Sequence, residues 1–321
     1  MIWQLLLIAL AVIALAVLYL ALVPPSYAGL VPHPRPAAGY GEAVQRVEAK
    51  LAGEATGHNP LCHTQLLTHG EKTARAIAFI HGYTNCPLQF LSLGQKFHDL
   101  GYNVLILLMP HHGLQDRMTA EHQKLTAEEL TAYVDEIVDI ERGLGEHVTL
   151  VGLSGGAVVA AWAAQTRRDL DRAVVIAPAF AFKRIPRALT VLVTNLALLA
   201  PDVLSWWDPI HKDAGRIAHV YPRFSFHGLA QQLRLGFVTI ALARRDAPAT
   251  RQILVITNAH DSSVNNAATA DVVADWRAHG CDVRTYEFPA ELGLEHDLVD
   301  PGQPYQKVAE VYPKLIELIN K

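Results

Sequence analysis

Residues 152–156, Gly-Leu-Ser-Gly-Gly, have the spacing of a serine nucleophile presented by a tight turn. An apolar run precedes them at residues 148–151, and small helix-compatible residues follow at 157–160. A serine in so sharp a strand-to-helix turn has a strained backbone, and Gly152 and Gly156 would let strand and helix pass closely. Ser154 is therefore a candidate nucleophile; a glycine-rich turn with an incidental serine is the alternative.

A serine hydroxyl needs a histidine to accept its proton, and that histidine needs an acid to fix its tautomer. In open parallel sheets, functional residues lie in the loops at the carboxyl ends of the strands. The loops after the predicted strands at 252–257 and 283–288 supply Asp261 and His296, respectively. We predict that Ser154, Asp261 and His296 form a catalytic triad.

Each assignment has a simpler alternative. Asp261 would suit the N-cap of the following helix, and a loop histidine is often only solvated. His260 is a rival base, but it shares the loop of Asp261 and would leave the last strand's loop without a role. Glu295 and Asp297 flank His296 and could tune it, although exposed loop charges are the commoner case.

The oxyanion formed in acyl transfer needs preorganised N–H donors, each contributing roughly 3–4 kcal/mol. We predict one donor at the backbone N–H of Gly155, directly after the candidate nucleophile. The second is predicted at the N–H of Tyr83, in the loop His81-Gly82-Tyr83-Thr84 after a strand at 76–80. Gly82 would let this backbone approach closely, and the Tyr83 ring is expected to line the pocket.

Strand and helix patterns alternate along most of the chain. Predicted strands lie at 76–80, 103–108, 148–153, 173–177, 252–257 and 283–288, with helices at 88–100, 125–144, 155–168, 264–279 and 305–319. Strands that are apolar throughout and separated by helices indicate a parallel sheet covered on both faces. The alternation stops at 179–250, where apolar segments at 188–200 and 229–243 predict a helical cap.

Residues 2–23 are apolar apart from Gln4, and at about 1.5 Å per residue they could span a hydrocarbon core of about 30 Å. We predict an uncleaved single-pass membrane anchor, whose orientation the flanking charges do not specify. A secretory signal peptide is the alternative, because Ser26-Tyr27-Ala28 offers small residues for cleavage. Five prolines and three glycines at 24–41 predict an extended tether, followed by a short helix at 42–51.

The composition excludes several other classes of protein. With 27 Lys and Arg against 31 Asp and Glu, the net charge is −4, and no basic stripe indicates nucleic-acid binding. Sixteen histidines are scattered without metal-site spacing, so no metal is expected. Cys62 and Cys86 could pair in an oxidising compartment and leave Cys281 free; three unpaired thiols are the alternative.

Together these motifs resemble the α/β-hydrolase superfamily from about residue 60 to the end. Residues 101–113 are similar to the carboxylesterase and monoacylglycerol-lipase branch, where Gly-His-Gly follows this strand; here His112-Gly113 match and His111 replaces the first glycine. The resemblance implies a mostly parallel eight-stranded sheet, no cofactor, and a supporting role for His112 at the oxyanion loop. His81 and Gly82 are expected to support the same loop.

We therefore expect an α/β-hydrolase fold made of a transmembrane anchor (1–23), a tether with a short helix (24–58), a core (59–178 and 251–321) and a cap (179–250). The expected function is a membrane-anchored serine hydrolase of the carboxylesterase or monoacylglycerol-lipase type, acting on a small ester or lipid. An apolar cap favours a greasy acyl chain, since each buried CH₂ contributes about 0.8 kcal/mol. The alternatives are a thioesterase or peptidase, or a silent member that binds a lipid or a partner protein.

Overall fold

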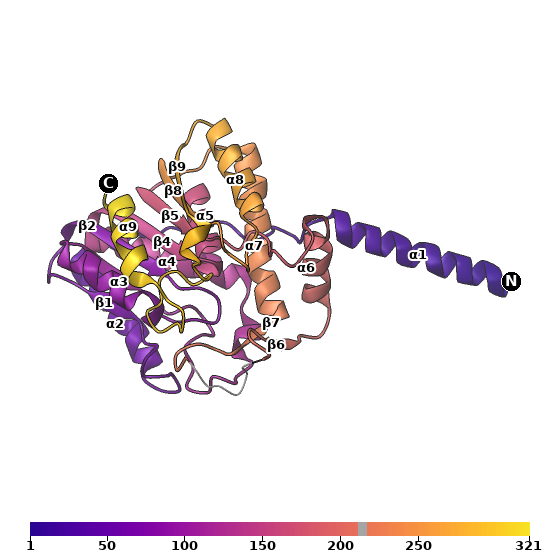
Figure 1. The fold of residues 1–321 in the computed structure, drawn as a ribbon, viewed down its shortest axis with the longest axis horizontal. Coiled ribbons are helices and arrows are strands. Elements are labelled where there is room, and N and C mark those ends of the chain that lie inside the picture. The colour runs from indigo at the N-terminus through magenta and orange to yellow at the C-terminus, as the bar shows by residue number, and fades with distance from the viewer. Residues whose placement is uncertain (211–216) are drawn as a thin grey trace.

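The structure is a computed structural model that describes residues 1–210 and 217–321. Its main sheet has the strand order β1-β3-β2-β4-β5-β8-β9, and β1 alone runs antiparallel to its neighbour (Figure 1). The strands are β1 (Gln65–Leu67), β2 (Thr73–Ile80), β3 (Asn103–Ile106), β4 (Gly145–Leu153), β5 (Arg172–Ile176), β8 (Gln252–Asn258) and β9 (Asp282–Phe288). The expected mostly parallel α/β sheet is confirmed.

The described residues give this sheet seven strands, so the expectation of eight is wrong. The reason lies before β1. Residues 40–54 form helix α2 (Tyr40–Glu54), and the chain from there to β1 contains turns and one isolated bridge, His58 to Leu114. A single short antiparallel strand, β1, therefore forms the edge of the sheet beside β3.

Helices pack around the sheet as the alternating pattern predicts. Phe79 of β2 stacks on Phe90 of α3, and α4, α5, α7 and α8 contact one another in series. Helix α4 begins with a capping box in which Thr126 and Glu129 bond each other's backbone N–H groups. The helices after α2 are α3 (Leu88–Asp99), α4 (Ala127–Leu144), α5 (Gly155–Thr166), α6 (Thr190–Leu199), α7 (Phe226–Arg245), α8 (Asn266–Ala278) and α9 (Val308–Asn320).

The segment between β5 and β8 is less purely helical than expected. It contains α6 and α7, but also an antiparallel ribbon of β6 (Leu204–Trp206) and β7 (Arg223–Ser225). Residues 211–216 of the predicted cap lie outside the described part of the chain. Helix α7 packs on α5, the helix that follows the Gly-Leu-Ser-Gly-Gly turn, so this inserted segment reaches the turn directly.

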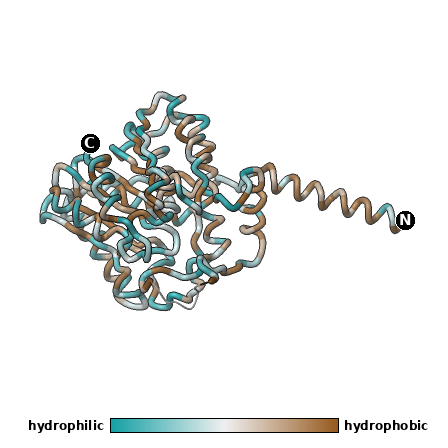
Figure 2. Tube along the Cα trace, in the orientation of Figure 1, coloured by the Kyte–Doolittle hydropathy of each residue, from teal (hydrophilic) through white to brown (hydrophobic). Residues whose placement is uncertain are grey.

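At the N-terminus, helix α1 (Ile2–Leu22) projects from the body (Figure 1), and all of its residues are exposed except Leu20 and Ala21, which are half-buried. Among the described residues it is the one helix long and apolar enough to cross a membrane. Figure 2 shows hydrophobic residues along most of its length. A signal sequence has the same length and composition, so these features alone do not separate the two.

The segment between α1 and α2 has no helix or strand, and hydrogen bonds hold part of it against α4. Its backbone N–H groups at His33 and Arg35 donate to Asp135 (2.6 Å) and Asp139 (2.8 Å) of α4. The guanidinium of Arg167, 1% exposed, binds the same two carboxylates at 2.7 and 2.6 Å. Arg167 therefore neutralises buried charges that hold residues 33–35 in place.

We predict that Arg167→Met lowers the free energy of unfolding by about 3–5 kcal/mol, because it leaves Asp135 and Asp139 as buried unpaired charges. Urea unfolding followed by circular dichroism measures this loss. Arg187→Met is the matched control, since the Arg187–Asp271 pair is half-exposed and should contribute less than about 1 kcal/mol. Equal effects of the two variants would contradict the role given to Arg167.

Candidate active site

Ser154 occupies a tight turn between β4 and α5. Its φ is +57°, a left-handed conformation that is strained for a residue with a side chain. A Cβ at Gly156 would lie 2.3 Å from the carbonyl oxygen of Ile80, and one at Gly152 would lie 2.1 Å from that of Gly156. The turn therefore requires glycine at both positions, as the sequence spacing indicated.

The side chains of Ser154, His296 and Asp261 form one hydrogen-bonded chain. The imidazole of His296 lies between the other two, with Nε2 at 2.8 Å from Ser154 Oγ and Nδ1 at 2.7 Å from Asp261 Oδ2. Because a carboxylate only accepts, Nδ1 carries the proton and Nε2 is free to accept from the serine hydroxyl. His296 is 23% exposed and the Asp261 carboxylate is fully buried.

Asp261 does not cap the following helix, because the N-cap of α8 is Asn265. Its Oδ1 instead accepts from the N–H groups of Ser263 (2.7 Å) and Val264 (3.1 Å). Burial opposes ionisation, but the hydrogen bond and charge of His296 and these N–H groups hold the pKa of Asp261 below its usual value. The acid is thus an ionised, fixed acceptor for His296.

The rival base His260 is exposed and lies away from the hydroxyl of Ser154. Its Nδ1 is 3.1 Å from the carbonyl oxygen of Leu294, in the loop that carries His296. Of the two histidines considered as the base, His296 is therefore the one that contacts Ser154.

The loop after β2 is fixed by His81. Met109 donates its backbone N–H to His81 Nε2 at 3.1 Å, so Nδ1 carries the proton and donates to the carbonyl oxygen of Gly82 at 3.0 Å. Burial lowers the pKa of His81 to about 4, so the ring is neutral at physiological pH. A Cβ at Gly82 would lie 3.7 Å from the carbonyl oxygen of Leu153, which places this loop beside the nucleophile turn.

The two predicted oxyanion donors are the N–H groups of Tyr83 and Gly155. Gly155 is the first residue of α5, where N–H groups have no partner within the helix. Tyr83 precedes Thr84, whose φ of +68° marks a second strained position. The Tyr83 ring is buried and packs edge-on against His112, at 5.5 Å between centroids.

His112 supports this loop by packing. Its ring lies 5.6 Å from that of His81, and its Nδ1 donates to the carbonyl oxygen of Pro110 at 2.8 Å. His111, which stands where the resembled branch has glycine, has φ +63°, the left-handed region that glycine favours. Its ring binds Glu129 at 3.1 Å, which helps to hold a conformation that histidine adopts more readily than most side chains.

Two further residues at this site were not predicted from the sequence. His122 is fully buried, with its ring 5.8 Å from that of Tyr83, and neither ring nitrogen has a partner among the described residues. Gln232 of α7 is 2% exposed, and its Oε1 lies 1.9 Å from where a Cβ at residue 155 would stand. Glycine at 155 thus makes room for a side chain from the inserted segment, a long-range packing relation with no local sequence signal.

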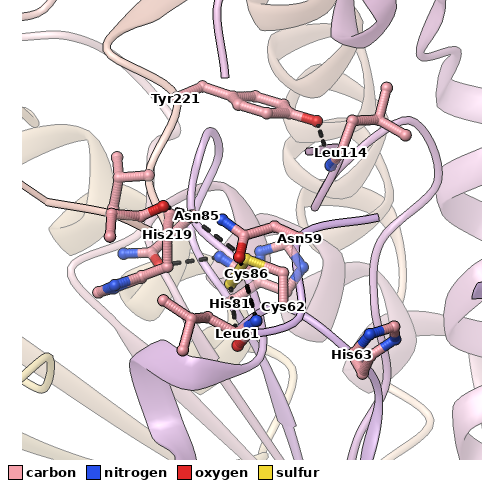
Figure 3. The surroundings of a disulfide bond; sticks show 12 residues. Asn59, Leu61, Cys62, His63, His81, Asn85, Cys86, Leu114, His219 and Tyr221 are labelled. Carbon is pink, nitrogen blue, oxygen red and sulfur yellow. Dashed lines mark hydrogen bonds between the residues drawn. A yellow bond between two sulfur atoms is a disulfide. The ribbon is translucent and has the colours of Figure 1, made fainter. Parts of the chain in front are cut away.

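Cys62 and Cys86 form a disulfide, and Cys281 is free and half-buried. The bond lies beside His81, Asn85 and His219 (Figure 3). It ties the chain before β1 to the residues directly after Thr84, and so reinforces the oxyanion loop from outside. No group of three or more His, Cys, Asp or Glu suited to a metal occurs within residues 1–210 and 217–321.

Residues 71–298 match the family described as serine aminopeptidase, S33, a family of hydrolases. The chain belongs to this family. No curated protein sequence matches it, and its likeness to solved structures is at the level of the fold. Those structures confirm the α/β-hydrolase fold that the motifs predicted.

Three solved structures illustrate this likeness. One structure, described under the metagenome-derived lipolytic enzymes LipS and LipT, gives 16% identity and a TM-score of 0.63, over 81% of this chain and 98% of that chain. The Paleococcus ferrophilus monoacylglycerol lipase gives 18% and 0.57, over 80% and 97%. A soluble variant of the Saccharomyces cerevisiae monoglyceride lipase, in complex with a substrate analogue, gives 12% and 0.57, over 80% and 90%.

We predict that His122→Phe makes the protein less sensitive to acid. Burial lowers the pKa of His122 to about 4, so as pH falls from 6.5 to 4 the unfolded state binds a proton first and stability is lost. At pH 4.5 the variant should lose about 2 kcal/mol less than the wild type, relative to pH 7.5. Urea unfolding at both pH values tests this, with exposed His279→Phe as control; identical losses in all three proteins would refute it.

Proposed function

We propose that the chain hydrolyses carboxylic esters through an acyl-enzyme on Ser154. Its Oγ attacks the ester carbonyl while His296 Nε2 takes the hydroxyl proton, and the N–H groups of Tyr83 and Gly155 bind the oxyanion. The tetrahedral intermediate collapses, the ester C–O bond breaks, and His296 returns its proton to the departing alcohol. Water, deprotonated by His296, then attacks the acyl carbon; the bond between this carbon and Ser154 Oγ breaks, His296 returns the proton to Ser154, and the acid is released.

The observation that carries this proposal is the continuous chain from Ser154 through His296 to the buried Asp261, at 2.8 and 2.7 Å. A protein that only binds a ligand has no need for a hydroxyl, an imidazole and an ionised acid in that order. Family membership adds support for hydrolase chemistry. Because the family is described as serine aminopeptidase, a peptide amide is the second candidate substrate class.

The contacts around the C-terminal end of α1 support a membrane-derived ester as the substrate. The side-chain amide of Asn195 in α6 donates to the carbonyl oxygens of Leu20 and Val23, each at 2.8 Å, and so caps the end of α1. On the same side, Leu199 is 71% exposed and Val203 58%. We infer that α1 is retained as an anchor and that α6, which lies beside the C-terminal end of α1 (Figure 1), rests at the bilayer surface.

The Cys62–Cys86 disulfide indicates on which side of the membrane the domain lies. Disulfides persist in oxidising compartments and are rare in a reducing cytosol. We therefore propose that the domain after α1 lies on an extracytoplasmic side of the membrane.

We predict that Ser154→Ala lowers kcat/KM on p-nitrophenyl butyrate by more than about 10³-fold, and that Asp261→Asn lowers it by about 10³–10⁴-fold through the wrong imidazole tautomer. His260→Ala, in the acid's loop, is the matched control and should retain activity within a few-fold. Assays on butyrate, laurate and peptide p-nitroanilides separate the two substrate classes. Turnover that survives Ser154→Ala would overturn the mechanism.

We also predict that the intact chain, from residue 1 onward, stays in membranes after carbonate extraction. Ile13→Arg places a charge in the middle of α1, at a cost of about 3 kcal/mol, and should weaken this retention. Intact-mass measurement of the extracted protein decides between anchor and signal peptide. A soluble product that begins near residue 29 would contradict anchoring and support cleavage after Ala28.

A further inference from the structure

The side chain of Gln89 joins the oxyanion loop to the loop of the candidate base. Its Oε1 accepts the backbone N–H of Gly82 at 2.7 Å, and its Nε2 donates to Asp297 Oδ2, also at 2.7 Å. Gln89 is 2% exposed and lies in the first turn of α3. One buried amide therefore spans from the residue before Tyr83 to the residue after His296.

The acceptor at the far end of this bridge is itself fixed. Asp297 Oδ1 accepts from the N–H groups of Val299 and Asp300, at 3.3 and 3.2 Å. Its Oδ2 also receives the side-chain amides of Asn85 (3.2 Å) and Gln303 (3.1 Å). With a donor needed here and an acceptor needed at Gly82, the Gln89 amide has one possible orientation.

The geometry of the peptide bond explains why Gly82 must be held. The carbonyl oxygen of Gly82 accepts from His81 Nδ1 at 3.0 Å and from the N–H of Asn85 at 3.1 Å. The N–H of Tyr83 belongs to the same planar peptide and points away from that carbonyl. Glycine has no side chain to restrict rotation about its own φ, so Gln89 supplies the restraint on the other side.

We propose that Gln89 is a positioning residue, which sets the Tyr83 N–H relative to His296 by bridging Gly82 and Asp297. The inference rests on the proposed ester hydrolysis. It assigns to Gln89 no contact with substrate. Its effect is on the stabilisation of the oxyanion, a species present only along the reaction path, so its loss should lower kcat and leave KM nearly unchanged.

The first test compares Gln89→Met with Gln303→Met in the full-length protein. Both remove an amide from Asp297, but the side-chain hydrogen bonds of Gln303 to described residues go to Asp297 and Asp300 and not to the oxyanion loop. We expect Gln89→Met to lower kcat on p-nitrophenyl butyrate by about 10²-fold with KM within two-fold, since loss of one oxyanion donor costs about 10²–10³. We expect Gln303→Met to stay within three-fold of the wild type.

A second variant keeps the test informative even if Gln89→Met folds poorly. Gln89→Asn keeps a polar amide at this position, but its side chain is one methylene shorter and cannot reach both Gly82 and Asp297. We expect this variant also to lose about 10²-fold in kcat, with KM within two-fold of the wild type.

A butyl boronic acid, whose tetrahedral adduct on serine places an oxygen among the oxyanion donors, supplies a readout besides turnover. Its inhibition constant should rise in each variant by the factor by which kcat/KM falls. Equal kcat losses for Gln89→Met and Gln303→Met, a loss confined to KM, or a wild-type kcat in Gln89→Asn would overturn the role of Gln89. Wild-type turnover that does not depend on Ser154 would instead overturn the proposed function and this inference with it.

Discussion

The backbone at Ser154 is held in a conformation that its surroundings must impose, at a cost of about 1–3 kcal/mol. The N–H of Ser154 donates to the carbonyl oxygen of Ile176 on β5, and its own carbonyl accepts from Ala179, at 3.0 and 3.2 Å. Gly156 then lets the first turn of α5 lie directly on the end of β2. This constraint fixes where the hydroxyl points, and every other residue of the site is placed with respect to it.

The parallel register of the sheet brings the partners to the same edge. The sheet contains four successive parallel neighbours, β4, β5, β8 and β9. The loops after β4, β8 and β9 therefore lie at the same edge of the sheet, and they carry Ser154, Asp261 and His296, respectively. β2 lies on the other flank of β4 and supplies the oxyanion loop. Gly82 gives that loop conformational freedom. The loop is restrained by the disulfide at Cys86, by the packing of His112 and by the side-chain amide of Gln89. The site is thus assembled at the ends of strands and held by side chains that pack behind them.

Much of this could be predicted from the sequence because it depends on local patterns. Apolar runs such as 148–153 specify buried parallel strands, and glycines at fixed spacing specify the turn at Ser154. Strands of three residues, such as β6, have no period to read, and the pairing of β1 with β3 depends on distant residues. By contrast, single side chains hold residues 33–35 against α4 and connect Gly82 to Asp297 through Gln89, and these hydrogen bonds join residues far apart in the sequence. A sequence shows that such residues are polar, but it does not show which partner they meet in the fold.

The central claim is that Ser154 is a nucleophile activated by His296. The most direct measurement is mass spectrometry of the full-length protein after treatment with a fluorophosphonate, which reacts covalently with activated serines. We predict a single adduct on the peptide that contains Ser154. It should form at least about 10²-fold more slowly in His296→Ala, because that variant lacks the base. No adduct on that peptide, or one that forms equally fast without His296, would contradict it.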